Sequence, residues 1–431
     1  MAATWKFDVT LLDLTGYSSD GALLYRDDDD RLVVRIHSSS ESGLYDDFYV
    51  QEPRSTELQS TDGGLSWEPC EGQFPLPGVV TSSGKRVYIW NELLKGDRLW
   101  EHLDTEGIGH LYRPGAHMMH RLYRGEKRAD LEARGLFLFD AFDGLVAALP
   151  EIVLFESEDD GQTWSQRSLE KAPPFAWVCG WHQRRGLVLG DGTLLGAVYG
   201  LRERRDVARR VWITRSTDNG QSWEFVQLYY DEEEQLGLGE TCLTLLPSGR
   251  VMAMSRPHFA DRHTMCCSFS DDRGQSWTRP KQVPFWGYPP HATVLDDGSL
   301  MVSYAHRRHP YGIRACISHD EGATWDVENE KILRDDSMPK GVGYPESAQL
   351  SDGSLFTVWA MSKIAALKPE DEVAYGKTLV LHPWFHTFVG GSRYSLDYVR
   401  ARGQERAPQG VYARRTTPES GTDAIVGSPQ R

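Results

Sequence analysis

Apolar residues along this chain occur in short runs that are interrupted by turn residues at regular intervals. Four segments join two apolar runs through an Asp-Gly or Ser-Gly pair, and they are 188–195, 246–251, 295–300 and 350–355. Weaker copies of this pattern lie at 27–31 and 82–84. A turn pair of this kind is typical of a β-hairpin, because glycine accepts the positive φ that a tight turn requires. The pattern therefore predicts a series of hairpins.

A second repeat alternates with these hairpins. Five segments follow the order Ser, any residue, Asp, any residue, Gly, any residue, Ser or Thr, and Trp, and they are 60–67, 157–164, 216–223, 270–277 and 318–325. In each eight-residue motif the Asp and hydroxyl side chains suit bonds to the turn backbone, and the Trp suits packing beneath the turn. We interpret all five Asp residues as structural. Self-similarity at a period of about 50 residues indicates a propeller or a solenoid.

The two repeats together define six units, each with an inner and an outer hairpin, except the last, which lacks the motif. Four strands per unit predict an all-β fold, a six-bladed β-propeller of four-stranded antiparallel blades that spans residues 1–400. The last blade is expected to be completed by 378–388 or by 394–400. The N-terminal segment 6–14 is expected to close the ring.

Two segments depart from the repeat. Residues 91–149 separate two motifs that would otherwise be adjacent, and 121–142 is rich in Leu, Ala, Arg and Glu at helix-like spacing. This stretch predicts an insertion with short helices that lies over one face of the propeller. Residues 401–431 are polar and rich in Pro, Gly, Ser and Thr, which predicts a disordered C-terminal tail.

Charge and hydropathy restrict the partners. The net charge of −15 and an isoelectric point of about 5.4 disfavour nucleic acid and anionic membranes, although a local group of arginines still permits an anionic small substrate. No apolar run reaches 18 residues, and residues 1–14 lack a basic region followed by an apolar core. These features predict a soluble, cytoplasmic protein, and a native start elsewhere would be compatible with secretion. We expect no metal and no organic cofactor, and the sequence leaves the oligomeric state open.

Strand direction sorts the chemically active residues between two faces. Both kinds of turn lie on one face, because successive antiparallel strands reverse direction. Residues that precede the first strand of a blade or follow its second strand gather on the opposite face, around the central axis. The side chains that we expect there include Arg35, Trp181, Glu240, Arg256, Tyr288, His291, Arg307, Arg308 and Tyr344.

This set of side chains indicates a particular chemistry. Several guanidinium groups directed at one point suit a carboxylate, which each can bind through two hydrogen bonds. A tyrosine beside a glutamate suits nucleophilic catalysis, because the carboxylate can take the phenolic proton as the oxygen attacks. The alternative for each arginine is a solvated ion pair with one of the many acidic residues.

The eight-residue motifs are similar to the Asp-box repeats of the sialidase superfamily, and the resemblance covers about residues 19–361. Residues 239–256 resemble the sialidase segment with the glutamate partner of the nucleophile and the second of three carboxylate-binding arginines. Residues 343–353 resemble the segment with the nucleophilic tyrosine. The resemblance implies Tyr344 as the nucleophile and Glu240 as its base, with Arg256 as a carboxylate clamp.

The arginines of that family are matched only in part. The Arg-Ile-Pro segment expected in the first blade is missing, and Arg35 and Arg26 are positional substitutes for its arginine. Where the third arginine is expected the chain has Tyr311, so Arg308 and Arg314 are displaced candidates. The sequence is therefore identified as a divergent member of the superfamily.

The leading hypothesis is an exo-acting, retaining glycoside hydrolase that acts on a terminal acidic sugar. Tyr344 would attack the anomeric carbon while Glu240 accepts its proton. The family also implies an acidic proton donor in the loop before the first motif, where Asp46 and Asp47 lie, and Asp47 is the preferred candidate. Arg256, Arg308 and Arg35 would hold the substrate carboxylate.

Two other functions fit the same scaffold. A polysaccharide lyase that acts on uronic-acid glycans would use His291 or Tyr288 as the base and an arginine to neutralise the carboxylate. A non-catalytic propeller would bind a glycan or a protein through aromatic residues such as Trp181 and Tyr311. The sugar and its linkage are open in every case.

Overall fold

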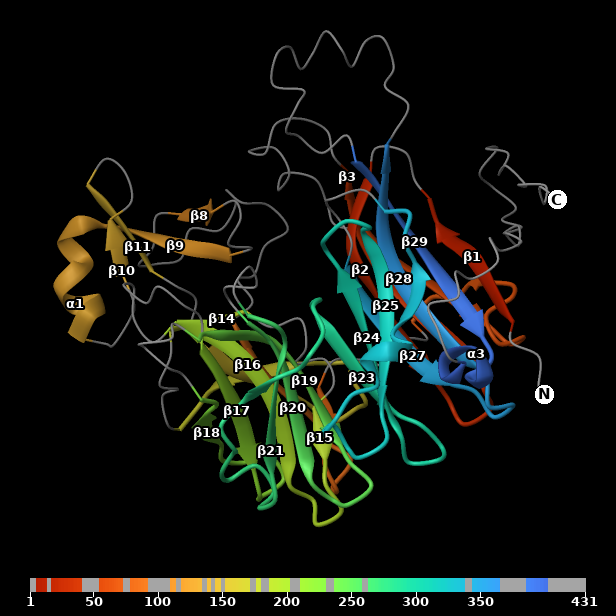
Figure 1. The fold of residues 1–431 in the computed structure, drawn as a ribbon. Coiled ribbons are helices and arrows are strands. Elements are labelled where there is room, and N and C mark those ends of the chain that lie inside the picture. The colour runs from red at the N-terminus through yellow and green to blue at the C-terminus, as the bar shows by residue number, and fades with distance from the viewer. Residues whose placement is uncertain are drawn as a thin grey trace, which may run out of the picture.

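The structure is a computed structural model, in which six antiparallel blades, five of them four-stranded and one five-stranded, surround a central axis (Figure 1). It describes residues 5–13, 17–40, 54–72, 78–91, 109–113, 118–133, 138–140, 144–148, 152–170, 176–179, 186–201, 210–229, 236–257, 263–337, 343–364 and 385–401. The predicted fold class, a six-bladed β-propeller, is confirmed.

The first three blades follow one another along the chain. Blade one consists of β2 (Tyr17–Arg26), β3 (Leu32–Ser40), β4 (Arg54–Ser60) and β5 (Glu68–Pro69). Blade two consists of β6 (Val79–Val80), β7 (Arg86–Asn91), β12 (Ile152–Ser157) and β13 (Ser165–Ser168). Blade three consists of β14 (Ala176–Cys179), β15 (Leu187–Val188), β16 (Leu194–Leu201), β17 (Arg210–Ser216) and β18 (Glu224–Gln227), and β14 and β15 both pair with β16.

The last three blades carry most of the candidate site. Blade four consists of β19 (Leu238–Leu245), β20 (Val251–Pro257), β21 (Cys266–Ser270) and β22 (Lys281–Gln282). Blade five consists of β23 (Pro290–Val294), β24 (Leu300–His306), β25 (Gly312–Ser318) and β26 (Lys331–Arg334), with a 3-10 helix, η3 (Val327–Asn329), before β26. Blade six consists of β27 (Gly343–Gln349), β28 (Leu355–Ile364), β29 (Phe385–Tyr394) and β1 (Lys6–Leu12).

The ring is closed by the N-terminal strand. β1 pairs with β29, so the start of the chain is the outermost strand of blade six, as predicted for 6–14. The predicted completion by 378–388 is partly right, because β29 begins at Phe385. The alternative completion by 394–400 is wrong, because Leu396–Arg400 forms the short helix α3, which Ser395 caps by accepting a bond from the Tyr398 N–H.

The eight-residue motif folds as predicted, and the copy at 270–277 shows how. The Ser270 hydroxyl donates to Asp272 at 2.8 Å and accepts from the Gly274 N–H at 2.8 Å. Arg273 and Gly274 both have positive φ, 60° and 83°. The Trp277 indole N–H donates to the Gly274 carbonyl at 3.2 Å. The motif therefore satisfies its own turn and needs no external ligand.

The apolar core lies mainly between neighbouring blades. Trp67 of the first motif packs on Phe356 of blade six, with ring centres 5.4 Å apart. Trp325 in blade five packs on Phe285 at 5.4 Å, at its boundary with blade four. The tryptophans of the motifs thus stabilise the blade interfaces through apolar burial. Because each blade depends on its neighbour, the strand ends at the axis are held in fixed relative positions.

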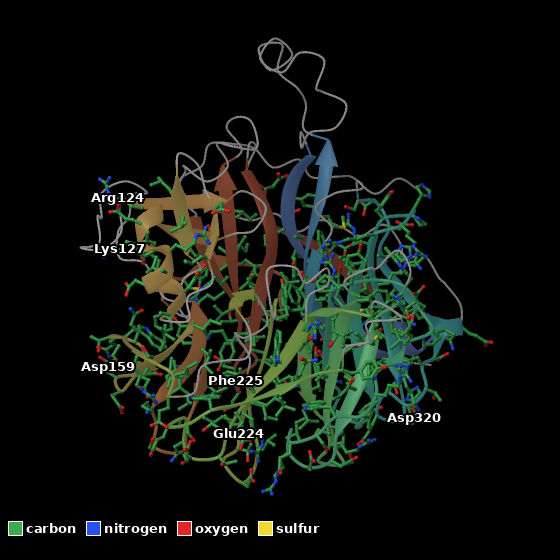
Figure 2. All side chains as sticks on the ribbon, turned by 90° about the vertical axis from the view of Figure 1, so that its left-hand side faces the viewer. Arg124, Lys127, Asp159, Glu224, Phe225 and Asp320 are labelled. Atoms are coloured by element: carbon green, nitrogen blue, oxygen red, sulfur yellow. The ribbon has the colours of Figure 1, made fainter. Side chains whose placement is uncertain are left out.

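Both kinds of turn lie on the same face, as predicted. Arg393 donates to the Asp62 carbonyl of a motif at 2.9 Å and to the Asp352 carboxylate of a hairpin turn at 2.6 Å. In Figure 2, Asp159 and Asp320 of two motifs lie in the lower half of the molecule, and Arg124 and Lys127 of the insertion lie in the upper half. We call the end opposite to the motifs the site face.

The described part of the insertion contains short helical elements, as predicted, but more of its residues form β-strands, which the sequence did not predict. Its strands β8 (Gly109–Arg113), β9 (Met118–Arg124), β10 (Leu138–Asp140) and β11 (Leu145–Ala148) form a separate sheet in the order β10-β11-β9-β8. One 3-10 turn, η1 (Gly125–Lys127), leads into one short helix, α1 (Arg128–Ala133). A small cluster of Tyr123, Leu131 and Val146 holds helix and sheet together. The insertion leaves blade two after β7 and projects from the site face (Figure 2).

Two sequence predictions are left open. The predicted disordered tail, 401–431, lies outside the described residues except for Ala401, so the single domain over 1–400 stays a prediction. Within the described ranges, no helix is long and apolar enough to cross a bilayer.

Candidate active site

Two blades bring a tyrosine, a glutamate and an arginine together on the site face. Tyr344 lies at the start of β27 in blade six, and Glu240 lies near the start of β19 in blade four. The Tyr344 hydroxyl donates to Glu240 Oε1 at 2.8 Å across the intervening blade. These residues are 104 positions apart in the sequence, and the propeller brings them into hydrogen-bonding distance.

The backbone at Tyr344 is strained. Its φ is 45°, and the pairing of β27 with β28 shifts register between Gly343 and Glu346. A bulge at a strand end redirects a side chain, and positive φ in a bulky residue costs free energy that the surrounding structure must supply. Such strain is concentrated at functional sites.

Glu240 is held by two partners. Its side chain is only 6% exposed, and Arg256 Nη1 contacts both of its oxygens at 3.0 and 2.9 Å. Burial alone would lower the pKa of the Arg256 guanidinium, but the charge and hydrogen bonds of Glu240 outweigh burial and raise that pKa. Arg256 therefore stays charged and keeps Glu240 oriented towards Tyr344.

Tyr344 keeps its proton at neutral pH. Burial and the adjacent Glu240 charge raise the pKa of the phenol well above 10, while Arg307 and Arg256 act in the opposite direction. A free phenolate therefore does not accumulate. The hydroxyl can become a nucleophile only when its proton passes to Glu240 as the oxygen forms a new bond.

Two guanidinium groups lie close to the ring of Tyr288. The Cζ atom of Arg256 is 4.2 Å from the centre of its ring, and that of Arg307 is 5.1 Å away. Arg307 follows β24, and Tyr288 precedes β23, so both belong to blade five. Arg256 and Arg307 place positive charge beside the Tyr344–Glu240 pair, where a bound anion would require it.

His291 lies on β23 and is engaged by the backbone. Its Nδ1 atom accepts a bond from the Ser347 N–H at 3.2 Å, three residues beyond Tyr344. This bond assigns the ring proton of neutral His291 to Nε2. His291 therefore supports the strand that carries Tyr344.

Three arginines that the sequence put forward as carboxylate ligands have contacts of their own in the structure. Arg35 lies within β3 and pairs with Glu57 on β4, with Arg35 Nη2 2.7 Å from Glu57 Oε1. Arg308 is exposed and lies over the ring of Trp286, with its Cζ atom 4.0 Å from the ring centre. The displaced candidate Arg314 pairs with Glu330 at 2.6 Å inside blade five. Neither Arg35 nor Arg314 is directed at Tyr344 by any of these contacts.

Two predicted site residues lie outside the described residues. They are Asp47, the expected proton donor, and Trp181, the expected binding residue. Trp286 was not singled out from the sequence, although it lies only two residues before Tyr288 and thus on the same loop. Among the described residues, no three His, Cys, Asp or Glu side chains are arranged to hold a metal ion.

Comparisons with known proteins agree with the architecture. The family of BNR repeat-like domains matches residues 136–357. A comparison with curated protein sequences gave no match. A solved structure of a protein of unknown function from Dyadobacter fermentans is 18% identical, covers 92% of this chain and 100% of its own, and has a TM-score of 0.61, which supports the fold.

Two further solved structures are more distant and belong to glycosidases. A mutant of the NanB sialidase from Streptococcus pneumoniae is 14% identical, with a TM-score of 0.49 over 91% of this chain and 71% of that one. The α-L-arabinofuranosidase Arb93A from Fusarium graminearum is also 14% identical, with a TM-score of 0.49 over 91% and 99% of the two chains.

Proposed function

The chain belongs to the family of BNR repeat-like domains, and we propose that it is an exo-acting, retaining glycoside hydrolase that removes a terminal acidic sugar. The observation that carries this proposal is the 2.8 Å hydrogen bond from the Tyr344 hydroxyl to Glu240 beside the cations Arg256 and Arg307. A tyrosine nucleophile is a known departure from the use of two carboxylates. A neutral phenol approaches an anionic sugar without charge repulsion.

In the first step, Tyr344 Oη bonds to the anomeric carbon while its proton passes to Glu240. The bond from that carbon to the leaving oxygen breaks, and the leaving oxygen takes a proton from the acid, for which Asp47 is the candidate. Arg307 and Arg256 hold the carboxylate of the sugar through their N–H groups. Arg256 also fixes Glu240 as a charged acceptor, so one arginine serves both base and substrate.

In the second step, water attacks the anomeric carbon and displaces Tyr344 Oη. The phenolic oxygen recovers its proton from Glu240, and the acid group takes a proton from the water. Two displacements at one carbon retain its configuration. Both carboxyl groups end in the protonation states in which they began.

The test is hydrolysis of aryl glycosides of acidic sugars, with sialosides and uronides in the same panel. Tyr344→Phe removes the nucleophile, and Glu240→Gln removes the proton acceptor, so each is expected to lower kcat by about a hundredfold or more. Tyr25→Phe and Glu71→Gln are matched controls, because both side chains are exposed and belong to blade one, whereas the Tyr344–Glu240 pair belongs to blades six and four. Thermal unfolding of each variant checks the fold, and full turnover by Tyr344→Phe would contradict the proposal.

A uronate lyase is the second candidate, and the position of Tyr288 beside two guanidinium groups favours it. Those cations would neutralise a uronate carboxylate while Tyr288 removes the neighbouring proton. His291 is a weaker base candidate, because its Nδ1 atom already accepts from the Ser347 N–H. An unsaturated product that absorbs ultraviolet light, and its loss in Tyr288→Phe but not in Tyr344→Phe, would favour the lyase. Binding without turnover of any glycan would favour a non-catalytic propeller.

A further inference from the structure

A cluster of aromatic residues and an arginine extends the site outward along blade five. The ring of Trp286 makes edge contacts with Tyr288 at 5.3 Å and with His306 at 5.5 Å between ring centres. Arg308 lies over the ring of Trp286, with its Cζ atom 4.0 Å from the ring centre. We call Trp286, Tyr288, His306 and Arg308 the blade-five platform. Its contacts run from Tyr288, which Arg256 and Arg307 approach, to Trp286 and then to Arg308.

The platform is fixed by its own backbone. The Tyr288 N–H donates to the Ala305 carbonyl at 2.9 Å, which ties the loop before β23 to the end of β24. Between Trp286 and Tyr288, a Cβ atom on Gly287 would lie 2.1 Å from the ring of Tyr304 and 2.9 Å from the Ala305 oxygen. Glycine at this position therefore lets the two segments approach closely enough to present Trp286.

The loop that carries Arg308 is fixed as well. His306 is 8% exposed, and its Nδ1–H donates to the Pro310 carbonyl at 3.0 Å, which spans the loop 307–309. Burial, reinforced by the nearby Arg314, lowers the pKa of His306, so the ring is neutral at pH 7 and makes this bond through one nitrogen. Arg308 thus lies over Trp286 on a loop that is anchored at both ends.

The position of Arg308 differs from that of the other arginines of this region. Arg256 contacts Glu240, and Arg314 contacts Glu330. Arg308 is exposed, and within the part of the chain that the structure describes no carboxylate pairs with it. A guanidinium that lies over a ring keeps its edge N–H groups in a plane parallel to the ring, where they can bind an anionic oxygen pair.

We propose that Arg308, held on the blade-five platform, binds a carboxylate or sulfate on the sugar that follows the terminal one, so that the substrate is an oligosaccharide with charge on successive sugars. Arg256 and Arg307 flank Tyr288 at the inner end of the platform, and Arg308 flanks Trp286 at its outer end. Two anionic groups on neighbouring sugars match these two cationic positions. The assignment of the inner position to the terminal sugar rests on the proposed function, whereas the binding of an anion by Arg308 does not.

The test is calorimetric titration of the full chain with three charged oligosaccharides, each paired with an uncharged form of the same length. The pairs are tetragalacturonate and its methyl ester, α2,8-linked trisialic acid and its methyl ester, and 6-O-sulfated chitotetraose and chitotetraose. Tyr344→Phe serves as the background, because it blocks the proposed turnover and leaves Arg308 in place. The pairs distinguish a carboxylate from a sulfate.

At least one charged probe is expected to bind more tightly than its uncharged form. Arg308→Ala is expected to raise the Kd of that charged probe about tenfold and to leave the Kd of its uncharged form unchanged. The affinity of Arg308→Lys for the charged probe should lie between those of the parent and of Arg308→Ala. Lysine keeps the positive charge but lacks the paired N–H donors of a guanidinium group. Arg250→Ala is the matched control, since Arg250 also lies over an aromatic ring, Phe269 at 4.8 Å, but pairs with Asp271 on the opposite face.

Three results would overturn the proposal: no charged probe preferred over its uncharged form, an unchanged Kd in Arg308→Ala, or an equal loss for charged and uncharged probes. The fate of the proposed function is read separately, from turnover by the chain with Tyr344 intact. Arg308-dependent binding without turnover would sustain this inference and reject the hydrolase. Turnover that depends on Tyr344 but not on Arg308 would sustain the hydrolase and reject this inference.

Discussion

Asp272 shows how a single carboxylate can be fully occupied by its own turn. It accepts from the Ser270 hydroxyl at 2.8 Å, from the Ser276 N–H at 2.9 Å and from the Ser276 hydroxyl at 2.6 Å. The bond from the Ser276 hydroxyl is the largest cause that lowers the pKa of Asp272 to about 2. The charged form is therefore the one that the folded turn prefers, and this explains why an acidic residue in a recurrent motif is structural.

The lowered pKa of Asp272 gives a prediction with a defined sign. Because the folded-state pKa of about 2 lies below the ordinary value of 3.8, the stabilisation is present above about pH 4 and is lost as the pH falls through 2. Asp272→Asn is expected to lower Tm at pH 7 by a few degrees, about 2–4 °C, since an amide nitrogen cannot accept from Ser276. In urea unfolding from pH 3 to pH 7, the difference in the free energy of unfolding between Asp272→Asn and the parent should be smaller at pH 3 than at pH 7.

The neighbouring exposed residue provides the control for Asp272. Asp271 is 68% exposed in its side chain and pairs only with Arg250, itself partly exposed. Asp271→Asn is expected to change the free energy of unfolding little, because exposed ion pairs contribute little. A loss in Asp272→Asn that is equally large at pH 3 and pH 7 would mean that the carboxylate charge has no part in the turn.

At the scale of elements, two loops of blade five interlock. β24 ends at His306, and the ring of that residue packs against Trp286 from the loop before β23. His306 also lies near Arg314 and Glu330, which pair with each other at 2.6 Å. Burial is the main cause of its lowered pKa, and Arg314 adds to it, so the folded state binds a proton at this site less readily than the unfolded chain.

This difference predicts how stability depends on pH. Below the unfolded value of about 6.5, the unfolded chain takes up the proton first, so stability falls as the pH decreases from about 6.5. His306→Gln removes this contribution and is expected to flatten the curve of unfolding free energy between pH 5 and pH 7. His319→Gln is the control, because His319 is exposed in a motif turn. Parallel curves for the parent and His306→Gln would contradict the prediction.

The elements also show what the sequence could predict and what it could not. Turn residues determine hairpins locally, so the blades and the end of each strand on which Glu240 and Tyr344 lie could be inferred. Arg35 could not be placed in the same way, because its partner Glu57 is chosen by cross-strand register inside blade one. The insertion sheet was missed because its strands are short and share only a small core around Leu131. Both the position of Arg35 and the insertion sheet depend on packing between segments that are separate in the sequence, which a local pattern does not show.

At the scale of the molecule, the site exists only while the ring is closed. Tyr344 in blade six meets Glu240 in blade four across blade five. Blade six is assembled from both ends of the described chain, since β1 is its outermost strand and β27 its innermost. The pairing of β1 with β29 confirms the predicted closure of the ring by 6–14.

A buried group of charges holds this closing strand. Lys6 donates to both oxygens of Asp8 at 2.5 and 2.6 Å, and Arg334 of blade five lies 3.5 Å from Asp8 Oδ2. The side chains of the three are between 2% and 7% exposed. Burial lowers the pKa of Lys6 despite the nearby Asp8, so the carboxylate is needed to keep the ammonium charged. Asp8 therefore links the start of the chain to blades five and six.

Asp8→Asn is expected to lower the free energy of unfolding by about 3 kcal/mol, because it leaves the buried Lys6 ammonium without its carboxylate partner, whereas Arg334 keeps its pair with Asp336. Lys6→Met combined with Asp8→Leu should cost less than the sum of the two single substitutions, since an apolar pair needs no charge compensation. Urea unfolding of the two single substitutions and of the double substitution measures this coupling, and strict additivity would contradict it.

Tyr344 belongs to the sheet that β1 closes, so the proposed hydrolysis should be lost at the urea concentration where β1 detaches. Activity that persists beyond that transition would show that the site does not require a closed ring.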